Sequence, residues 1–182
     1  NRRFSPMIQK IKNKLKNRVS PVIIYYRMNA GKLPNNHWIH KEGGRIIGEC
    51  CHIIDLMRFL TESSPIDIKV TPLNSPKSPF NNNDNCAITI QYNDGSVCTI
   101  HYFETGNEKS SKEYMECHFD NNSIILDNYT SLNGYGLNLN KKSKIINKGH
   151  SEEFQILEEF FNGTKSIWPI TLNELIETSE IS

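Results

Sequence analysis

The apolar positions follow a helical spacing in two early segments. Ile8, Ile11 and Leu15 recur at intervals of three and four, which places them on one face of a helix. A Ser-Pro pair directly before them is typical of a helix start, so we predict a helix over residues 6–18. Apolar residues return at the same intervals over residues 45–60 and occupy most of the circumference, which predicts a second, deeply buried helix.

The middle of the chain changes to a period of two, as in half-buried strands. A β-branched and aromatic run at 22–26 precedes this region and is also typical of a strand. Two hairpins are predicted, because strand-like runs flank short polar turns. The predicted strands lie at 87–92 and 97–103, at 114–119 and 123–126, at 66–70, and in shorter stretches at 136–139 and 144–146.

Two more helices are predicted at the end of the chain. One starts near Ser151, with Phe154, Leu157, Phe160 and Phe161 as its buried stripe. The other starts at Thr171, which forms a capping box with Glu174.

These elements predict an α+β fold with a mostly antiparallel sheet of five to seven strands and helices packed on one face. The other face then needs its own cover, which we expect at a subunit interface. On one strand this face carries either Thr99, His101 and Phe103 or the alternate set, Cys98, Ile100 and Tyr102.

Length, charge and cysteine content narrow the class of protein. The 182 residues, 37% of them hydrophobic, suit one globular domain, and a net charge of +1 gives no reason to expect nucleic acid as a partner. No apolar stretch approaches the ~20 residues of a membrane span. The five cysteines are an odd number within apolar segments, which favours reduced thiols and a cytoplasmic protein.

The common nucleotide and nucleophile motifs are missing from the sequence. It has no Gly-x-Gly-x-x-Gly after a strand, no P-loop and no Gly-x-Ser-x-Gly turn. Metal spacing is equally poor: Cys50-Cys51-His52 is contiguous, and His37 and His40 have no evident third ligand, so we predict no metal site.

The strongest candidate chemistry lies at the start of the second helix. In an α-helix, Gly48 lies about 40° and Glu49 about 60° from His52, so all three can border one cavity. Imidazole titrates near neutrality and suits proton exchange with an alcohol or carbonyl. The alternative interpretation is a core histidine satisfied by a hydrogen bond to a group such as Asp55.

Taken in order, several segments resemble the carboxy-terminal half of the Gfo/Idh/MocA oxidoreductases. They are Asn1 to Pro6, Tyr26 to Gly31, His37-Trp38, Gly43 to Glu49 and Cys51 to Asp55. The resemblance implies a two-domain enzyme in which NAD or NADP is bound mainly by a Rossmann domain that precedes this chain. Residues 1–20 would then be the end of that domain and a connecting helix, and residues 21–182 the α/β substrate and dimerisation domain. The family's Glu-Lys-Pro lysine belongs to the missing part, so we expect the isolated chain to be inactive.

The resemblance also implies roles for individual residues. His52 matches the catalytic histidine, while Gly48 stands where many members have an aspartate, a role that the adjacent Glu49 would take over. Substrate-binding positions are implied at Arg27, Asn29, His37, Trp38, Gly48 and Asp55. No cofactor-binding residue is assigned within the chain.

Two functions from different classes follow. The first is a dehydrogenase or reductase acting on a hydroxyl or ketone of a sugar or nucleotide sugar, forming a homo-oligomer through the open sheet face. The second is a non-catalytic ligand-binding or dimerisation module of the same fold, with Gly48 marking a lost centre. NAD-dependent glycoside cleavage, which some relatives of this fold perform, is a third possibility.

Overall fold

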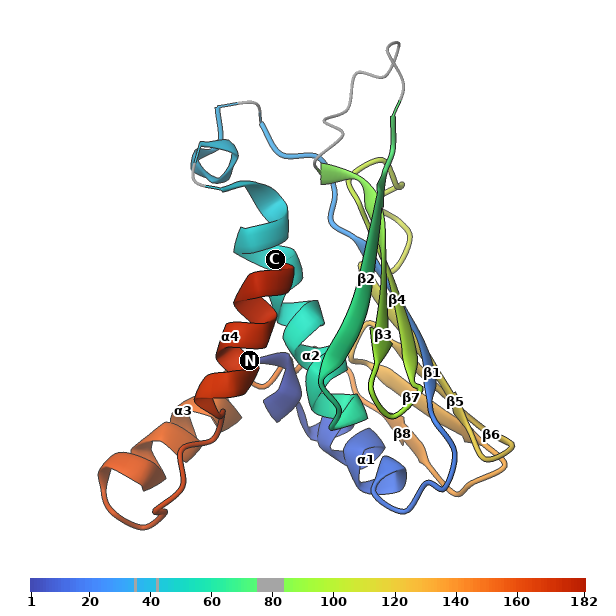
Figure 1. Ribbon diagram of the computed structural model, residues 1–182, viewed down its shortest axis with the longest axis vertical. Helices are drawn as coiled ribbons and strands as arrows, with labels where there is room; N and C mark the ends of the chain where they lie inside the picture. The colour runs from blue at the N-terminus through green and yellow to red at the C-terminus, as the bar shows by residue number, and fades with distance from the viewer. Residues whose placement is uncertain (35, 42, 75–83) are drawn as a thin grey trace.

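The computed structural model describes residues 1–34, 36–41, 43–74 and 84–182. Within these residues the chain forms an α+β fold in which helices lie on one side of an eight-stranded sheet (Figure 1). None of the described helices has the length and apolar character needed to cross a bilayer. The helices are η1 (Arg2–Phe4), α1 (Pro6–Leu15), η2 (Trp38–His40), η3 (Ile46–Cys50), α2 (Cys51–Thr61), α3 (His150–Phe161) and α4 (Leu172–Ile181). The strands are β1 (Ile23–Asn29), β2 (Pro65–Pro72), β3 (Cys86–Tyr92), β4 (Val97–Phe103), β5 (Glu113–Phe119), β6 (Asn122–Asp127), β7 (Ser131–Tyr135) and β8 (Asn140–Lys142).

The sheet is larger and less regular than expected. Its order in the described residues is β2-β3-β4-β1-β5-β6-β7-β8, with β1 parallel to β4 and antiparallel to β5. The predicted number of five to seven strands is therefore corrected to eight. The sheet is mostly antiparallel, as predicted, but the β1–β4 pair is parallel and makes it a mixed sheet. The sequence does not reveal this because β1 pairs with strands more than seventy residues away, and a parallel pair needs no tight turn.

The two predicted hairpins are confirmed, and the later strands are displaced. β3 pairs with β4 and β5 with β6, both antiparallel. The stretch expected as a strand at 136–139 is instead the connection between β7 and β8, and Gly136 at its start has a φ of 79°. The run expected at 144–146 follows β8 rather than forming a strand.

The core lies between the sheet and the first two α-helices. Ile8, Ile11 and Leu15 of α1 are buried, which confirms the predicted stripe, although α1 ends at Leu15 rather than at residue 18. The inward side chains of α2 are Ile53, Ile54, Leu56, Met57 and Leu60, and those of the central strands include Ile24, Tyr26, Met28, Ile88, Ile90, Ile100 and Tyr102.

None of the helices in the described part of the chain lies on the opposite face of the sheet (Figure 1). On β4, Cys98, Ile100 and Tyr102 are buried, so the open face carries the other set, Thr99, His101 and Phe103. His101 lies edge-on to Tyr25 of the neighbouring β1, with ring centroids 5.2 Å apart. The open face is thus a mixed polar and aromatic surface.

The last two helices differ from the prediction. α3 has the expected position, but it contains no buried residue, and Phe154 and Phe161 are 70% and 74% exposed. The expected buried stripe is therefore wrong for this chain, because no described element covers that face. The start of α4 is as predicted: Thr171 and Glu174 form a capping box.

All five cysteines are free thiols. Cys50, Cys98 and Cys117 are buried, and Cys51 and Cys86 are partly buried. Burial raises the pKa of Cys117 to about 12, so this thiol stays protonated near neutrality. These states agree with the prediction of reduced thiols.

Candidate active site

His52 lies in the first turn of α2, and the backbone before it is unusual. Residues Ile46–Cys50 form a π-helix, which is rare and is found frequently at functional sites. Gly43 and Gly44, just ahead of it, have φ angles of 87° and 77°, which side-chain-bearing residues rarely adopt. The polar loop therefore enters the helix through a turn that favours glycine.

The structure places His52 on a cavity of about 400 Å³. Ile47, Cys51 and Asp55 line the cavity from the same helical segment as His52. The remaining wall comes from both ends of the chain: Asn1, Glu153, Ile170, Leu175, Thr178, Ser179 and Ser182. The imidazole thus borders a space of the size that small ligands occupy.

The charge state of His52 follows from its surroundings. Desolvation in the cavity, followed by the positive charge of Arg2, lowers the pKa of His52 to about 4. The ring is therefore neutral at pH 7. A neutral imidazole at the surface of a cavity is able to accept a proton from a bound hydroxyl group.

Asp55 lines the same cavity one turn after His52, and its carboxylate is held by a guanidinium. Arg3 donates from Nε to Asp55 Oδ2 at 2.9 Å, and a second contact from Arg3 Nη2 reaches Oδ1. Arg3 also donates to Glu174 Oε1 at 3.1 Å, so it links α2 to α4. Asp55 is thus already occupied as an acceptor, which suits positioning of the cavity wall better than proton transfer.

Glu49 lies in a separate cluster of charges. Its Oε2 accepts from Tyr102 at 2.5 Å and from Arg45 at 2.9 Å, and its Oε1 accepts from Lys112 at 3.0 Å. Burial alone would raise the pKa of Glu49, but these three partners outweigh it and lower the pKa, so the carboxylate stays ionised.

Gly48 is exposed and faces the loop rather than lining the His52 cavity. A Cβ atom at this position would lie 2.7 Å from Cδ1 of Ile39, so the end of that side chain would have to move to admit any other residue. The expectation that Gly48, Glu49 and His52 border one cavity assumed α-helical steps of 100°. The π-helix changes that step, and of these three residues His52 is the one that lines the cavity.

The other positions implied as substrate-binding are spread over the domain, and Arg27 and Asn29 lie in β1 rather than in a loop. Arg27 donates to Ser110 at 2.9 Å, and Asn29 is buried, donating to the carbonyl of Asn107 at 2.8 Å. His37 caps η2 by accepting from the backbone N–H of Ile39 at 3.3 Å, and the neighbouring Trp38 is 58% exposed. These four side chains lie outside the His52 cavity, and their roles stay predictions.

Two polar residues of the cavity carry no signal in the sequence. Asn1 Oδ1 and Thr178 Oγ1 are buried and make no hydrogen bond with the described residues. Both line the His52 cavity, so each can bind a ligand hydroxyl there. They come from opposite ends of the chain, and only the tertiary fold brings them to His52.

The contiguous Cys50-Cys51-His52 sequence does not form a metal centre here. Cys50 is buried in the core, whereas Cys51 and His52 line the cavity. Among the residues that the structure describes, no three His, Cys, Asp or Glu side chains come together as a ligand set.

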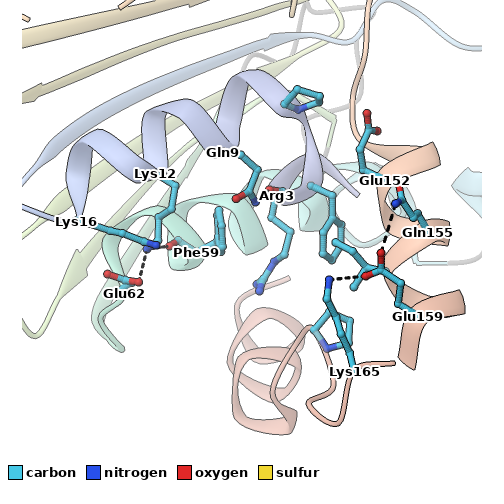
Figure 2. Close-up of a pocket in the computed structure, with 14 residues that line it drawn as sticks. Arg3, Gln9, Lys12, Lys16, Phe59, Glu62, Glu152, Gln155, Glu159 and Lys165 are labelled. Carbon is cyan, nitrogen blue, oxygen red and sulfur yellow. Dashed lines mark hydrogen bonds and ion pairs between the residues drawn. The ribbon is translucent and has the colours of Figure 1, made fainter. Parts of the chain in front are cut away.

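A larger cavity, of about 610 Å³, lies between α1, the end of α2, and α3 (Figure 2). Two ion pairs lie on its wall: Lys12 with Glu62 at 2.8 Å and Lys165 with Glu159 at 2.5 Å. The cationic ends of Arg3 and Lys12 lie about 5 Å from the centroid of the Phe59 ring. Among the described residues that line this cavity there is no histidine, so the His52 cavity is the stronger candidate for proton transfer.

Comparison with known proteins identifies the family to which this domain belongs. The GFO/IDH/MocA C-terminal domain matches residues 18–125, more than half of the chain. The chain therefore belongs to the Gfo/Idh/MocA family. A search of curated proteins finds no match.

Solved structures with the same fold are distant in sequence. UDP-N-acetylglucosamine 3-dehydrogenase GnnA from Acidithiobacillus ferrooxidans superposes with a TM-score of 0.73 at 14% identity, over 98% of this chain and 55% of that protein. GenD2 from gentamicin A biosynthesis, solved in complex with NAD, gives a TM-score of 0.69 at 14% identity over 100% of this chain and 57% of that one. A super-repressor mutant of Gal80p from Saccharomyces cerevisiae gives 0.67 at 15% identity over 93% and 52%. This chain thus spans little more than half the length of these proteins.

Proposed function

We propose that this chain is the substrate domain of an NAD(P)-dependent dehydrogenase or reductase that acts on a hydroxyl or ketone of a sugar or nucleotide sugar. The supporting observation is the neutral imidazole of His52 on a cavity that also holds two unpartnered polar groups. GnnA, which shares the fold, is named as a nucleotide-sugar dehydrogenase.

The same proposal divides the chain into two parts. Residues 1–20 end a preceding cofactor domain, and residues 21–182 form the substrate and dimerisation domain. The exposed apolar side chains of α3 and α4, such as Phe154, Phe161 and Leu172, offer a surface for that cofactor domain. The open sheet face offers a surface for a second copy of the chain.

The residues that line the cavity have different proposed roles at the reacting carbon. An NAD(P) cofactor held by the preceding domain would supply hydride transfer at that carbon. His52 accepts the hydroxyl proton during oxidation and returns it during reduction. Asn1 and Thr178 hydrogen-bond neighbouring hydroxyls and so orient the ring, while Ile47 and Leu175 provide apolar wall for its C–H groups.

The test is His52→Ala in the protein that includes its cofactor domain. We expect kcat to fall by roughly two to four orders of magnitude, because a general acid/base is lost. His101→Ala, on the open sheet face, is the matched control and is expected to change kcat by less than about twofold. A fall of less than about threefold in His52→Ala, with the fold intact, refutes the proposed role of His52.

A second candidate function is a non-catalytic ligand-binding module. It is favoured by Gly48, which stands where the family resemblance implies an aspartate, and by the Gal80p super-repressor among the proteins of the same fold. Absence of turnover with NAD(P) and any sugar, despite sugar binding that depends on Thr178, is the outcome that supports the module. The isolated 182-residue chain is expected to show neither turnover nor micromolar NAD(P) binding in calorimetric titration.

A further inference from the structure

A second cavity, of about 500 Å³, lies between the edge of the sheet, the start of η3 and the end of α4. This volume is within the range of small-molecule sites. Most of its wall is apolar, and the polar side chains on it are few: His40, Arg45, Asp84 and Ser182. The apolar wall consists of Ile46, Val70, Pro72, Ile88 and Ile181.

Asp84 is the unusual residue of this cavity. It is 1% exposed, and neither of its carboxylate oxygens accepts a hydrogen bond from the described residues. His40 Nδ1 lies 3.4 Å from Oδ2, and Arg45 interacts with Asp84 through its charge. Burying a carboxylate without hydrogen bonds is costly, and such groups are uncommon in folded proteins. Asp84 therefore adds little to the stability of the fold and is a good candidate for binding a ligand.

Arg45 supplies an unpartnered donor on the same wall. It is also 1% exposed, and its terminal nitrogens donate to the carbonyl of Gly31 at 2.6 Å and to Glu49 at 2.9 Å. These contacts fix the guanidinium, while its Nε–H has no acceptor in the described chain. The cavity thus combines carboxylate acceptors with a fixed donor.

We propose that this cavity binds a neutral polyol, such as the ring of a sugar, through Asp84 and Arg45. A hydroxyl group donates to a carboxylate and accepts from a guanidinium, so two adjacent hydroxyls satisfy both residues. An ammonium group would satisfy Asp84 alone, and a phosphate would be repelled by it. The apolar wall suits the C–H face of the ring. The site is separate from the His52 cavity and does not depend on the proposed function.

The thermal stability of a variant distinguishes a ligand-binding role of Asp84 from a structural role. Replacing a buried, unpartnered carboxylate by an amide removes a desolvation cost, so Asp84→Asn is expected to raise the Tm of the ligand-free chain. If Asp84 serves only to hold the His40 loop by an ion pair, the Tm falls instead, which contradicts the proposal.

The binding experiment is an NMR titration of the 182-residue chain with myo-inositol as the neutral probe and D-glucosamine as the cationic one. We expect myo-inositol to shift the amide resonances of Cys86 and Ile181, and Asp84→Asn to weaken its affinity by about tenfold or more. Val70→Trp, which fills the cavity from an exposed position, is expected to abolish these shifts even if Asp84→Asn fails to fold.

A matched variant completes the design. Asp67→Asn changes an exposed aspartate on β2 outside the cavity. It is expected to leave myo-inositol affinity within about twofold. The proposal is overturned if myo-inositol does not bind, if its binding is insensitive to Asp84→Asn and Val70→Trp, or if only D-glucosamine binds.

Discussion

The helices on the sheet and the helices at the end of the chain bury their apolar side chains to very different extents. α1 and α2 carry apolar residues at intervals of three and four, and those facing the sheet are fully buried. α3 and α4 carry similar spacings, yet neither contains a buried residue. Periodicity therefore identifies the face of a helix that is to be covered, but it does not identify the segment that covers it.

The two regions also differ in the ion pairs that hold them to the rest of the chain. The sheet encloses Glu113, which is bound by Arg2, Lys148 and Tyr26 inside the core. By contrast, α4 is attached to the rest of the chain by ion pairs nearer the surface, Arg3 with Glu174 and Arg58 with Glu177. We therefore expect α3 and α4 to open locally well before the sheet unfolds.

The largest predicted effect is that of Glu113→Gln. Glu113 accepts from Arg2 Nε at 2.7 Å and lies 2.5 Å from Lys148 Nζ, so its neutral replacement leaves two cations without a counter-charge. We expect a loss of about 3–5 kcal/mol in the free energy of unfolding, measured by urea denaturation. Glu116→Gln on the open side of the same strand is the control and is expected to cost less than about 0.5 kcal/mol.

The same variant changes the pH dependence of stability. Burial alone would raise the pKa of Glu113, but Arg2 and Lys148 outweigh it and lower the pKa from 4.5 to about 2. Its contribution to stability is therefore present above about pH 4.5 and is lost as the pH falls toward 2. Glu113→Gln is expected to flatten this acid limb. An unchanged limb would show that Glu113 is not the group responsible.

Local patterns in the sequence predict local structure, but they do not predict contacts between residues that lie far apart in the chain. The capping box at Thr171 and the hairpin turn at Asn93–Ser96 are encoded within four residues, and the structure has both. The insertion of β1 between β4 and β5 depends on pairing across the whole domain and leaves no such signal.

The candidate site shows the same division. The sequence alone identifies His52, because the histidine and its glycine-rich approach are contiguous. Thr178 reaches the same cavity only through the packing of α4 on α2, which no short motif specifies. Regular helical geometry places Glu49 beside His52, but in the structure Glu49 lies in a π-helix, bonds Tyr102 and does not line the cavity.

An intermediate effect is predicted for Thr171→Ala, which removes the side-chain cap of α4. The lost hydrogen bond to the backbone N–H of Glu174 costs about 1 kcal/mol locally. Because α4 opens independently of the sheet, we expect amide exchange in α4 to accelerate about fivefold while the urea midpoint of the sheet is unchanged. A matching fall of global stability would show that α4 and the sheet unfold as one unit.

The smallest effect is predicted for a phenylalanine of α3, and it tests the comparison most directly. Phe161 is 74% exposed and Phe119 at the end of β5 is 8% exposed, so the same truncation probes both regions. We expect Phe161→Ala to change the free energy of unfolding of this chain by less than about 0.5 kcal/mol, whereas Phe119→Ala costs about 3–5 kcal/mol. A cost of about 2 kcal/mol or more for Phe161→Ala would mean that the α3 surface is already covered in solution, by a second copy of the chain. Dilution would then separate the two cases, because a contact between copies weakens with concentration and burial within one chain does not.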